Sequence, residues 1–187
     1  MGGVLAKKKD WAAAVAALHE AIRMQPKNAA AHGKLAAILA AQGGPAEGLR
    51  TLVAALKEHP DLAEQPPEYL RYDAACFAMN CADGLGDPPP PEAERAGYRK
   101  QALDFLTAEL AATRKRAGAA PAIVHRRLQH WLTDKDLASV RDPAILQLMP
   151  PEERDAWTRL WTDVRILRGQ TALKPAPRPS VKPGTKS

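Results

Sequence analysis

The sequence has two cysteines, and aromatic residues make up only 5% of its 187 residues. Two cysteines do not supply the disulfide framework on which small secreted domains depend, and they suit a reducing compartment.

No segment reaches the roughly 18 uninterrupted apolar residues of a membrane span. The nearest stretch, 29–41, is interrupted by Lys34. The N-terminus also lacks the ordered basic, apolar and cleavage regions of a signal peptide. We therefore expect a cytoplasmic protein that does not span a membrane.

Motifs for catalysis, cofactors and metals are missing as well. The segment 43–48 has the glycine spacing of a phosphate-binding loop, but Leu49-Arg50 follows it instead of Lys-Ser or Lys-Thr. His19-Glu20 lacks the second histidine of a zinc-protease helix. Cys76 and Cys81 are five residues apart and lie on different faces of a predicted helix. The sequence therefore predicts a protein that is not an enzyme and binds neither a cofactor nor a metal.

Positive charge is concentrated at the C-terminal end of the chain. The formal net charge is +6, and residues 170–187 contain four basic residues and no acid: Lys174, Arg178, Lys182 and Lys186. Residues 1–169 therefore carry a net charge of only +2, which gives little support to a nucleic-acid-binding face. The proline and lysine content predicts that residues 170–187 form a disordered tail. Nucleic-acid binding through this tail is the least supported of the functional hypotheses.

What the sequence does contain is an internal repeat of 34 residues. Four positions recur at this spacing, as the pairs Ala14 and Gly48, Leu18 and Leu52, Ala21 and Ala55, and Pro26 and Pro60. A fixed period of this length is typical of stacked helical repeats, in which each unit buries its apolar face only against its neighbours. Such an architecture indicates a binding scaffold.

Capping residues and prolines predict where the helices of these repeats begin and end. One helix over 10–24 begins at Asp10, a second over 28–42 begins at Asn28, and a third over 45–58 has a proline in its first turn. Helices of this length joined by short turns form antiparallel hairpins.

These residues resemble tetratricopeptide repeats. That family places small residues at three repeat positions and a proline near the end of the unit, and larger apolar residues between them. The second unit supplies Leu35, Ala36, Leu39, Gly48, Leu52, Ala55 and Pro60, and the preceding unit supplies Gly2, Leu5, Ala14, Leu18, Ala21 and Pro26. His32 stands where the family often has tryptophan. The resemblance implies an all-α fold, a tetratricopeptide-like solenoid of antiparallel helix pairs with a C-terminal helical cap.

Residues 1–60 are expected to form these repeats, with the first one truncated. Met1 falls at about the seventh repeat position, so most of an opening helix is missing. An exposed half-repeat is an unusual start for a solenoid, because terminal repeats carry a polar outer face. We therefore hypothesise that the chain is a piece of a longer repeat protein.

Beyond Pro60 the 34-residue period is lost. Residues 61–118 are expected to form a divergent third helix pair, with helices over 68–82 and 92–117 separated by a proline-rich insertion. Residues 119–169 are expected to form the cap, with a helix over 121–133, a polar turn, and two further helices that begin at prolines. Trp157 and Trp161 are interpreted as core residues of this cap.

Several segments of this second half resemble the C-terminal ends of large bacterial serine/threonine kinases and repeat proteins of the planctomycete type. They are residues 70–76, 98–106, 130–131, 136–142 and 157–161. The resemblance covers about residues 10–168 and implies a bacterial, kinase-associated and non-catalytic segment. An alternative function is therefore a regulatory C-terminal fragment of a kinase that lacks its catalytic domain.

The tetratricopeptide resemblance also implies a binding groove, lined by the first helix of each pair. The candidate groove residues are Lys34, Ala37, Ala41, Tyr72, Asp73, Cys76 and Asn80. The lysine and asparagine that clamp a terminal carboxylate in one subtype are replaced here by Gly33 and Ala37. Lys34 and Asp73 are equally compatible with a solvated surface. We predict a non-catalytic protein–protein interaction scaffold, whose groove binds a peptide or helix of a partner protein or of a larger parent protein.

Overall fold

The computed structural model describes residues 2–65 and 69–172, with side chains described from residue 10. The helices in chain order are α1 (Gly2–Met24), α2 (Ala29–Gly43), α3 (Pro45–Glu58), α4 (Leu70–Ala82), α5 (Glu92–Arg116), α6 (Pro121–Trp131), α7 (Pro143–Leu146) and α8 (Pro151–Gln170). Two short 3₁₀ turns accompany them, η1 (Pro60–Glu64) and η2 (Lys135–Leu137). Over the described ranges, the chain forms helices and no strands. The basic residues of the predicted tail, from Lys174 onward, lie outside these ranges.

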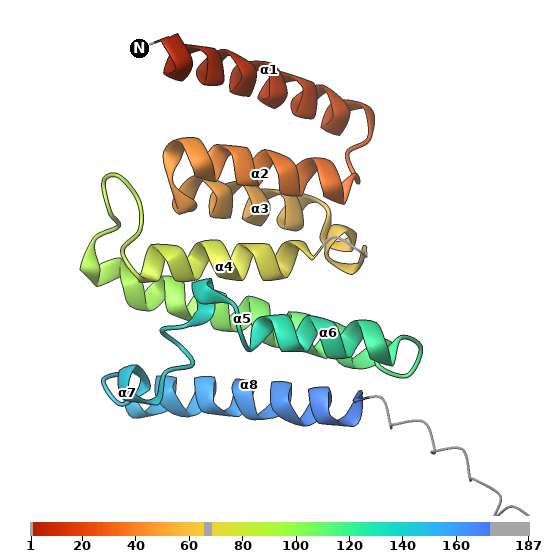
Figure 1. The fold of residues 1–187 in the computed structure, drawn as a ribbon, viewed down its shortest axis with the longest axis vertical. Coiled ribbons are helices and arrows are strands. Elements are labelled where there is room, and N and C mark those ends of the chain that lie inside the picture. Colours follow the sequence, from red (N-terminus) through yellow and green to blue (C-terminus); the bar gives the residue numbers. More distant parts are fainter. Residues whose placement is uncertain (1, 66–68, 173–187) are drawn as a thin grey trace, which may run out of the picture.

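The helices stack in chain order, from α1 at one end of the molecule to α8 at the other (Figure 1). The longer helices form antiparallel pairs, α2 with α3, α4 with α5, and α6 with α8, which follows the short helix α7 (Figure 1). In each pair the first helix runs in the same direction as the first helix of the next pair. This arrangement confirms the predicted all-α, tetratricopeptide-like solenoid.

Local sequence explains where α2 and α3 begin and end. The Asn28 side chain accepts a hydrogen bond of 3.0 Å from the backbone N–H of Ala31, as an N-cap residue does. Gly44 joins the two helices with φ of 86°, a left-handed conformation that glycine adopts without strain. Pro45 then occupies the first turn of α3. The predicted helices over 28–42 and 45–58 are confirmed.

The predicted helix start at Asp10 is wrong. Helix α1 runs without a break from Gly2 to Met24, so Asp10 lies in its interior. An aspartate caps a helix only where the backbone before it leaves the helical conformation. At the corresponding place in the next pair, Gly43, Gly44 and Pro45 force that turn. Residues 7–14 contain neither glycine nor proline, so nothing in the sequence interrupts the helix.

Small residues allow α3 to approach α2 and α4 closely. A Cβ atom added to Gly48 would lie 2.8 Å from Ala40 Cβ, 2.9 Å from Phe77 Cε2 and 3.0 Å from the carbonyl oxygen of Ala36. Ala36 is fully buried beside it. These distances explain why a glycine stands inside a helix, where it otherwise costs about 1 kcal/mol relative to alanine.

The last pair, α6 and α8, closes the core with tryptophans. Trp131, Trp157 and Trp161 are buried, and the rings of Trp157 and Trp161 stack with centroids 6.4 Å apart. The indole N–H of Trp161 donates a 2.6 Å hydrogen bond to the carbonyl oxygen of Val140, in the connection between α6 and α7. The interpretation of Trp157 and Trp161 as core residues is confirmed.

The close approach at Gly48 makes opposite predictions for two glycine substitutions. Gly48→Ala should lower the free energy of unfolding by about 1–3 kcal/mol, because the new methyl group overpacks the α2–α3–α4 contact. Gly97→Ala is the matched control in α5, where an added Cβ has no neighbour within 4 Å. It should raise stability by about 0.5–1 kcal/mol through helix propensity alone. Urea unfolding of both variants would show this, and stabilisation by both would contradict the packing role of Gly48.

Candidate protein-binding surface

The three candidate residues on α2 lie on its exposed side. Lys34, Ala37 and Ala41 are all solvent-exposed. Ala41 borders a hollow of about 500 Å³ between α2 and α1, whose other lining residues are Trp11, Ala12, Val15 and Gln42. None of the candidate residues of α4 lines this hollow. Ala41 and the candidate residues of α4 therefore border different hollows.

Two candidate residues of α4 line a second hollow, a groove of about 460 Å³ between α4 and α6. Tyr72 and Asp73 contribute from α4, and the residue before that helix, Tyr69, adds a second tyrosine. The lining residues from α6 are Ile123, Arg126, Arg127, His130 and Trp131. We call this hollow the α4–α6 groove.

Tyr72 forms the floor of the α4–α6 groove and is held in place from two sides. Its ring stacks on Trp131 with centroids 5.1 Å apart, and its hydroxyl donates a 2.6 Å hydrogen bond to the Asp134 carboxylate. Burial raises the pKa of this hydroxyl, so it remains a hydrogen-bond donor. The floor of the groove is therefore preorganised.

The remaining candidate residues, Cys76 and Asn80, lie beneath the chain that connects α6 to α7. Cys76 is only 8% exposed, and burial raises the pKa of its thiol, with Asp134 adding to the rise. The Asn80 side chain lies near the carboxyl of Asp136 and lowers its pKa, against the rise that burial causes. Within the described chain, both side chains are therefore occupied by internal contacts and lie apart from the open part of the groove.

Sequence reasoning missed most of the residues that α6 contributes. Ile123 is 52% exposed, and Arg126 and His130 are exposed beside it. Repeat matching does not identify them, because the 34-residue period is lost before α6. The signal that could have found them is the dibasic pair Arg126-Arg127 on a predicted amphipathic helix.

A buried carboxylate fixes the position of α6 beside α4. Glu109 of α5 is fully buried and forms ion pairs with three arginines, at 3.1 Å to Arg127 and 3.7 Å to both Arg71 and Arg116. Glu64 pairs with Arg71 at 2.8 Å and with Arg116 at 3.1 Å. These contacts join η1, α4, α5 and α6 at one point.

Burial and ion pairing act in opposite directions on the pKa values of Glu109 and Arg127. Burial raises the pKa of the Glu109 carboxyl, and the three guanidinium groups oppose that rise. Burial lowers the pKa of Arg127 to about 10, which leaves it protonated at neutral pH. Its guanidinium also lies over the ring of Tyr69, a cation–π contact at the edge of the α4–α6 groove.

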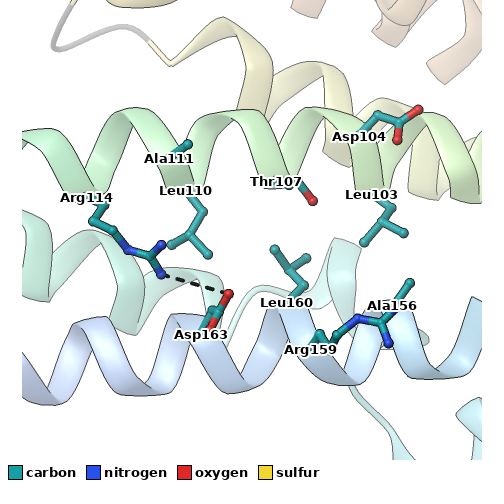
Figure 2. Close-up of a pocket in the computed structure, with 10 residues that line it drawn as sticks. All are labelled: Leu103, Asp104, Thr107, Leu110, Ala111, Arg114, Ala156, Arg159, Leu160 and Asp163. Carbon is teal, nitrogen blue, oxygen red and sulfur yellow. Dashed lines mark ion pairs between the residues drawn. The ribbon is translucent and has the colours of Figure 1, made fainter.

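A further hollow of about 480 Å³ lies between the second helices, α5 and α8. Leu103 and Leu110 of α5 point toward Leu160 of α8, and the Arg114–Asp163 pair, 3.9 Å apart, closes one side (Figure 2). Its four charged lining residues are two arginines and two aspartates, so their charges balance. This hollow offers little charge-based selectivity and is a weaker candidate than the α4–α6 groove.

Metal-binding and membrane features are absent from the described part of the chain. Residues 2–65 and 69–172 contain no group of three or more histidines, cysteines or carboxylates arranged to hold a metal ion. Among the same residues, no helix combines the length and apolarity needed to cross a membrane. Cys76 and Cys81 are both free and buried, and burial raises the pKa of Cys81 to about 11.

Comparison with known proteins agrees with the fold. Residues 5–70 match the family model of the tetratricopeptide repeat, a region that extends from α1 to the start of α4. Neither the curated proteins nor the solved structures gave a match to the chain. Tetratricopeptide repeats generally mediate protein–protein interactions, and the match together with the helix pairs supports a tetratricopeptide repeat protein.

The buried ion cluster predicts a large effect for a small substitution. Glu109→Gln should lower the free energy of unfolding by about 3–5 kcal/mol, because it leaves Arg127 without a carboxylate partner, whereas Arg71 and Arg116 keep Glu64. Asp104→Asn, on the same helix, removes one partner of the exposed Lys100–Asp104 pair and should change stability by less than about 1 kcal/mol. Chemical denaturation would measure both, and equal effects would show that the Glu109 contacts contribute no more than a surface pair.

Asp136 predicts a specific pH dependence. Burial raises its pKa above the ordinary value of 3.8, and the neighbouring Asp134 adds to the rise. The folded state therefore binds the proton more tightly, so the contribution to stability is present below the ordinary pKa and is lost as the pH rises through the folded pKa. Asp136→Asn should be more stable than the parent at pH 7 and equal to it below the ordinary pKa. Denaturation across this pH range would test it, and a pH-independent difference would contradict the assignment.

Proposed function

We propose that this chain is a non-catalytic scaffold that binds a peptide or a helix of a partner protein in the α4–α6 groove. The observation that carries the proposal is the composition of the groove lining. Tyr69, Tyr72, Arg126 and Arg127 are of the residue types that contribute most to protein-binding interfaces, and Ile123 adds an exposed apolar contact. The sequence offers no nucleophile, cofactor or metal motif that would favour an enzyme instead.

The rigidity of the groove supports the same function. Tyr72 is fixed by Trp131 and Asp134, and Arg127 is fixed by Glu109 and Tyr69. Side chains that are already ordered lose little conformational entropy when a partner binds. A peptide would therefore meet a surface whose floor requires no rearrangement.

A longer partner segment would extend from the α4–α6 groove onto α2. Lys34 and Ala37 are exposed on α2, the first helix of the preceding pair. A Cβ atom added to Gly33 would lie 3.2 Å from Leu70 Cδ2, so α2 and α4 lie close together at this point. The small side chains of α2 suit a shallow contact with an extended peptide or with one face of a helix.

Selection from a random peptide library, displayed on phage and applied to the full chain, tests this function without assuming a partner. Selected peptides should bind the parent protein and lose about tenfold or more in affinity for Arg126→Glu, because that charge lies in the groove. Arg165→Glu makes the same charge change at an exposed position of α8 and should bind normally. Failure to select any peptide, or equal binding to both variants, would remove the groove as the binding site.

A further inference from the structure

Residues 110–133 form a segment without acidic side chains. They contain five arginines and lysines and two histidines, and no aspartate or glutamate. The segment folds into the last turns of α5, the connection to α6, and the whole of α6. This helical hairpin therefore carries a local excess of positive charge, apart from the predicted tail.

Three of the five cations of this hairpin are already paired. Arg116 and Arg127 contact Glu109, and Arg114 lies 3.9 Å from Asp163. Lys115 and Arg126 are exposed and form no ion pair with a carboxylate of the described chain. They leave two charges available to a partner.

An apolar hollow of about 410 Å³ lies beside Lys115. Its lining residues are Tyr69, Thr113, Lys115, Arg116, Ala119, Ala120, Ile123, Val124 and Arg127. Tyr69, Ile123 and Arg127 also line the α4–α6 groove, so the two hollows meet at Ile123. Lys115 borders one hollow and Arg126 borders the other, with an apolar floor between them. We call this combined region the basic hairpin surface.

We propose that the basic hairpin surface binds an acidic peptide that carries an apolar residue between its acidic side chains. The apolar side chain packs against Ile123 and the neighbouring alanines, and the acidic side chains pair with Lys115 and Arg126. Charge complementarity carries the assignment, because Lys115 and Arg126 are unpaired in the described chain and Asp73 is the only carboxylate among the residues that line the two hollows. This inference rests on the proposed function and specifies the chemistry of the partner.

A protein partner fits this surface better than a nucleic acid does. Non-specific nucleic-acid binding needs a continuous basic track and exposed aromatic faces on which bases stack. Here two unpaired cations flank an apolar floor, and Arg127 already covers the ring of Tyr69. An apolar floor of this kind instead matches an aliphatic or aromatic side chain of a peptide.

Fluorescence anisotropy with labelled synthetic probes tests the proposal on the full chain. The probes are a peptide with leucine residues flanked by glutamates, the same peptide with serine in place of leucine, the same peptide with lysine in place of glutamate, and oligo(dT). The acidic leucine peptide should bind at least about tenfold more tightly than the other two peptides. Tighter binding of oligo(dT), or equal binding of all three peptides, would overturn the proposal.

Matched variants then locate the site. Ile123→Ser should weaken binding of the acidic leucine peptide about tenfold or more, whereas Ile166→Ser on α8 should not, although the two isoleucines are 52% and 51% exposed. Lys115→Ala and Arg126→Ala should each weaken it, and Arg165→Ala should not. Because all these side chains are exposed, thermal unfolding should remain close to that of the parent.

The peptide-library selection separates failure of this inference from failure of the proposed function. Selected peptides that depend on Arg126 but lack acidic residues would overturn the acidic-partner inference and leave the groove as the binding site. A selection that yields no peptide would overturn both. Enrichment of glutamate and aspartate around an apolar residue would support both.

Discussion

The buried carboxylate of Glu109 is the constraint on which the second half of the molecule depends. A fully buried charge is tolerated only where opposite charges surround it closely. Here those charges come from three different helices, through Arg71 of α4, Arg116 of α5 and Arg127 of α6. Compensating one carboxylate therefore sets how α6 lies against α4, and with it the shape of the α4–α6 groove.

The same constraint separates the roles of two neighbouring arginines. Successive residues of an α-helix point about 100° apart, so Arg127 can face Glu109 only if Arg126 faces elsewhere. Arg127 is held at the junction, and Arg126 is exposed along the groove. The Arg127–Glu109 ion pair thus leaves Arg126 on the side of α6 that borders the α4–α6 groove, the surface that we propose for binding.

The fold was predictable from the sequence to the extent that local signals determine it. Capping and turn effects reach only a few residues along the chain, as at Asn28, Gly43, Gly44 and Pro45. The sequence therefore predicts correctly the helices that these residues delimit. Asp10 was misread because a cap depends on the backbone before it, which the residue type alone does not reveal.

The candidate site was less predictable, because its contacts join residues far apart in the chain. Tyr72 meets Asp134 across 62 positions, and the Arg71–Glu109 pair spans a helix hairpin. No local pattern near Cys76 or Asn80 indicates that the connection between α6 and α7 covers them. Tyr72 and Asp73 were placed in a groove by the repeat resemblance, whereas Ile123 and Arg126 belong to a helix in which the period had already been lost.

Repeat positions specify how close helices approach, and they do so with small residues such as Ala36 and Gly48. They leave little room for side chains that recognise a particular partner, and the exposed side of α2 carries small residues such as Ala37 and Ala41 beside Lys34. Chemistry specific to this chain must therefore come from positions outside the pattern. The α4–α6 groove fits that expectation, because the α6–α8 pair does not follow the 34-residue period. The same pair carries the tryptophans that close the core. The last helix pair of the described chain thus also supplies charged and apolar residues of the groove that we propose for binding.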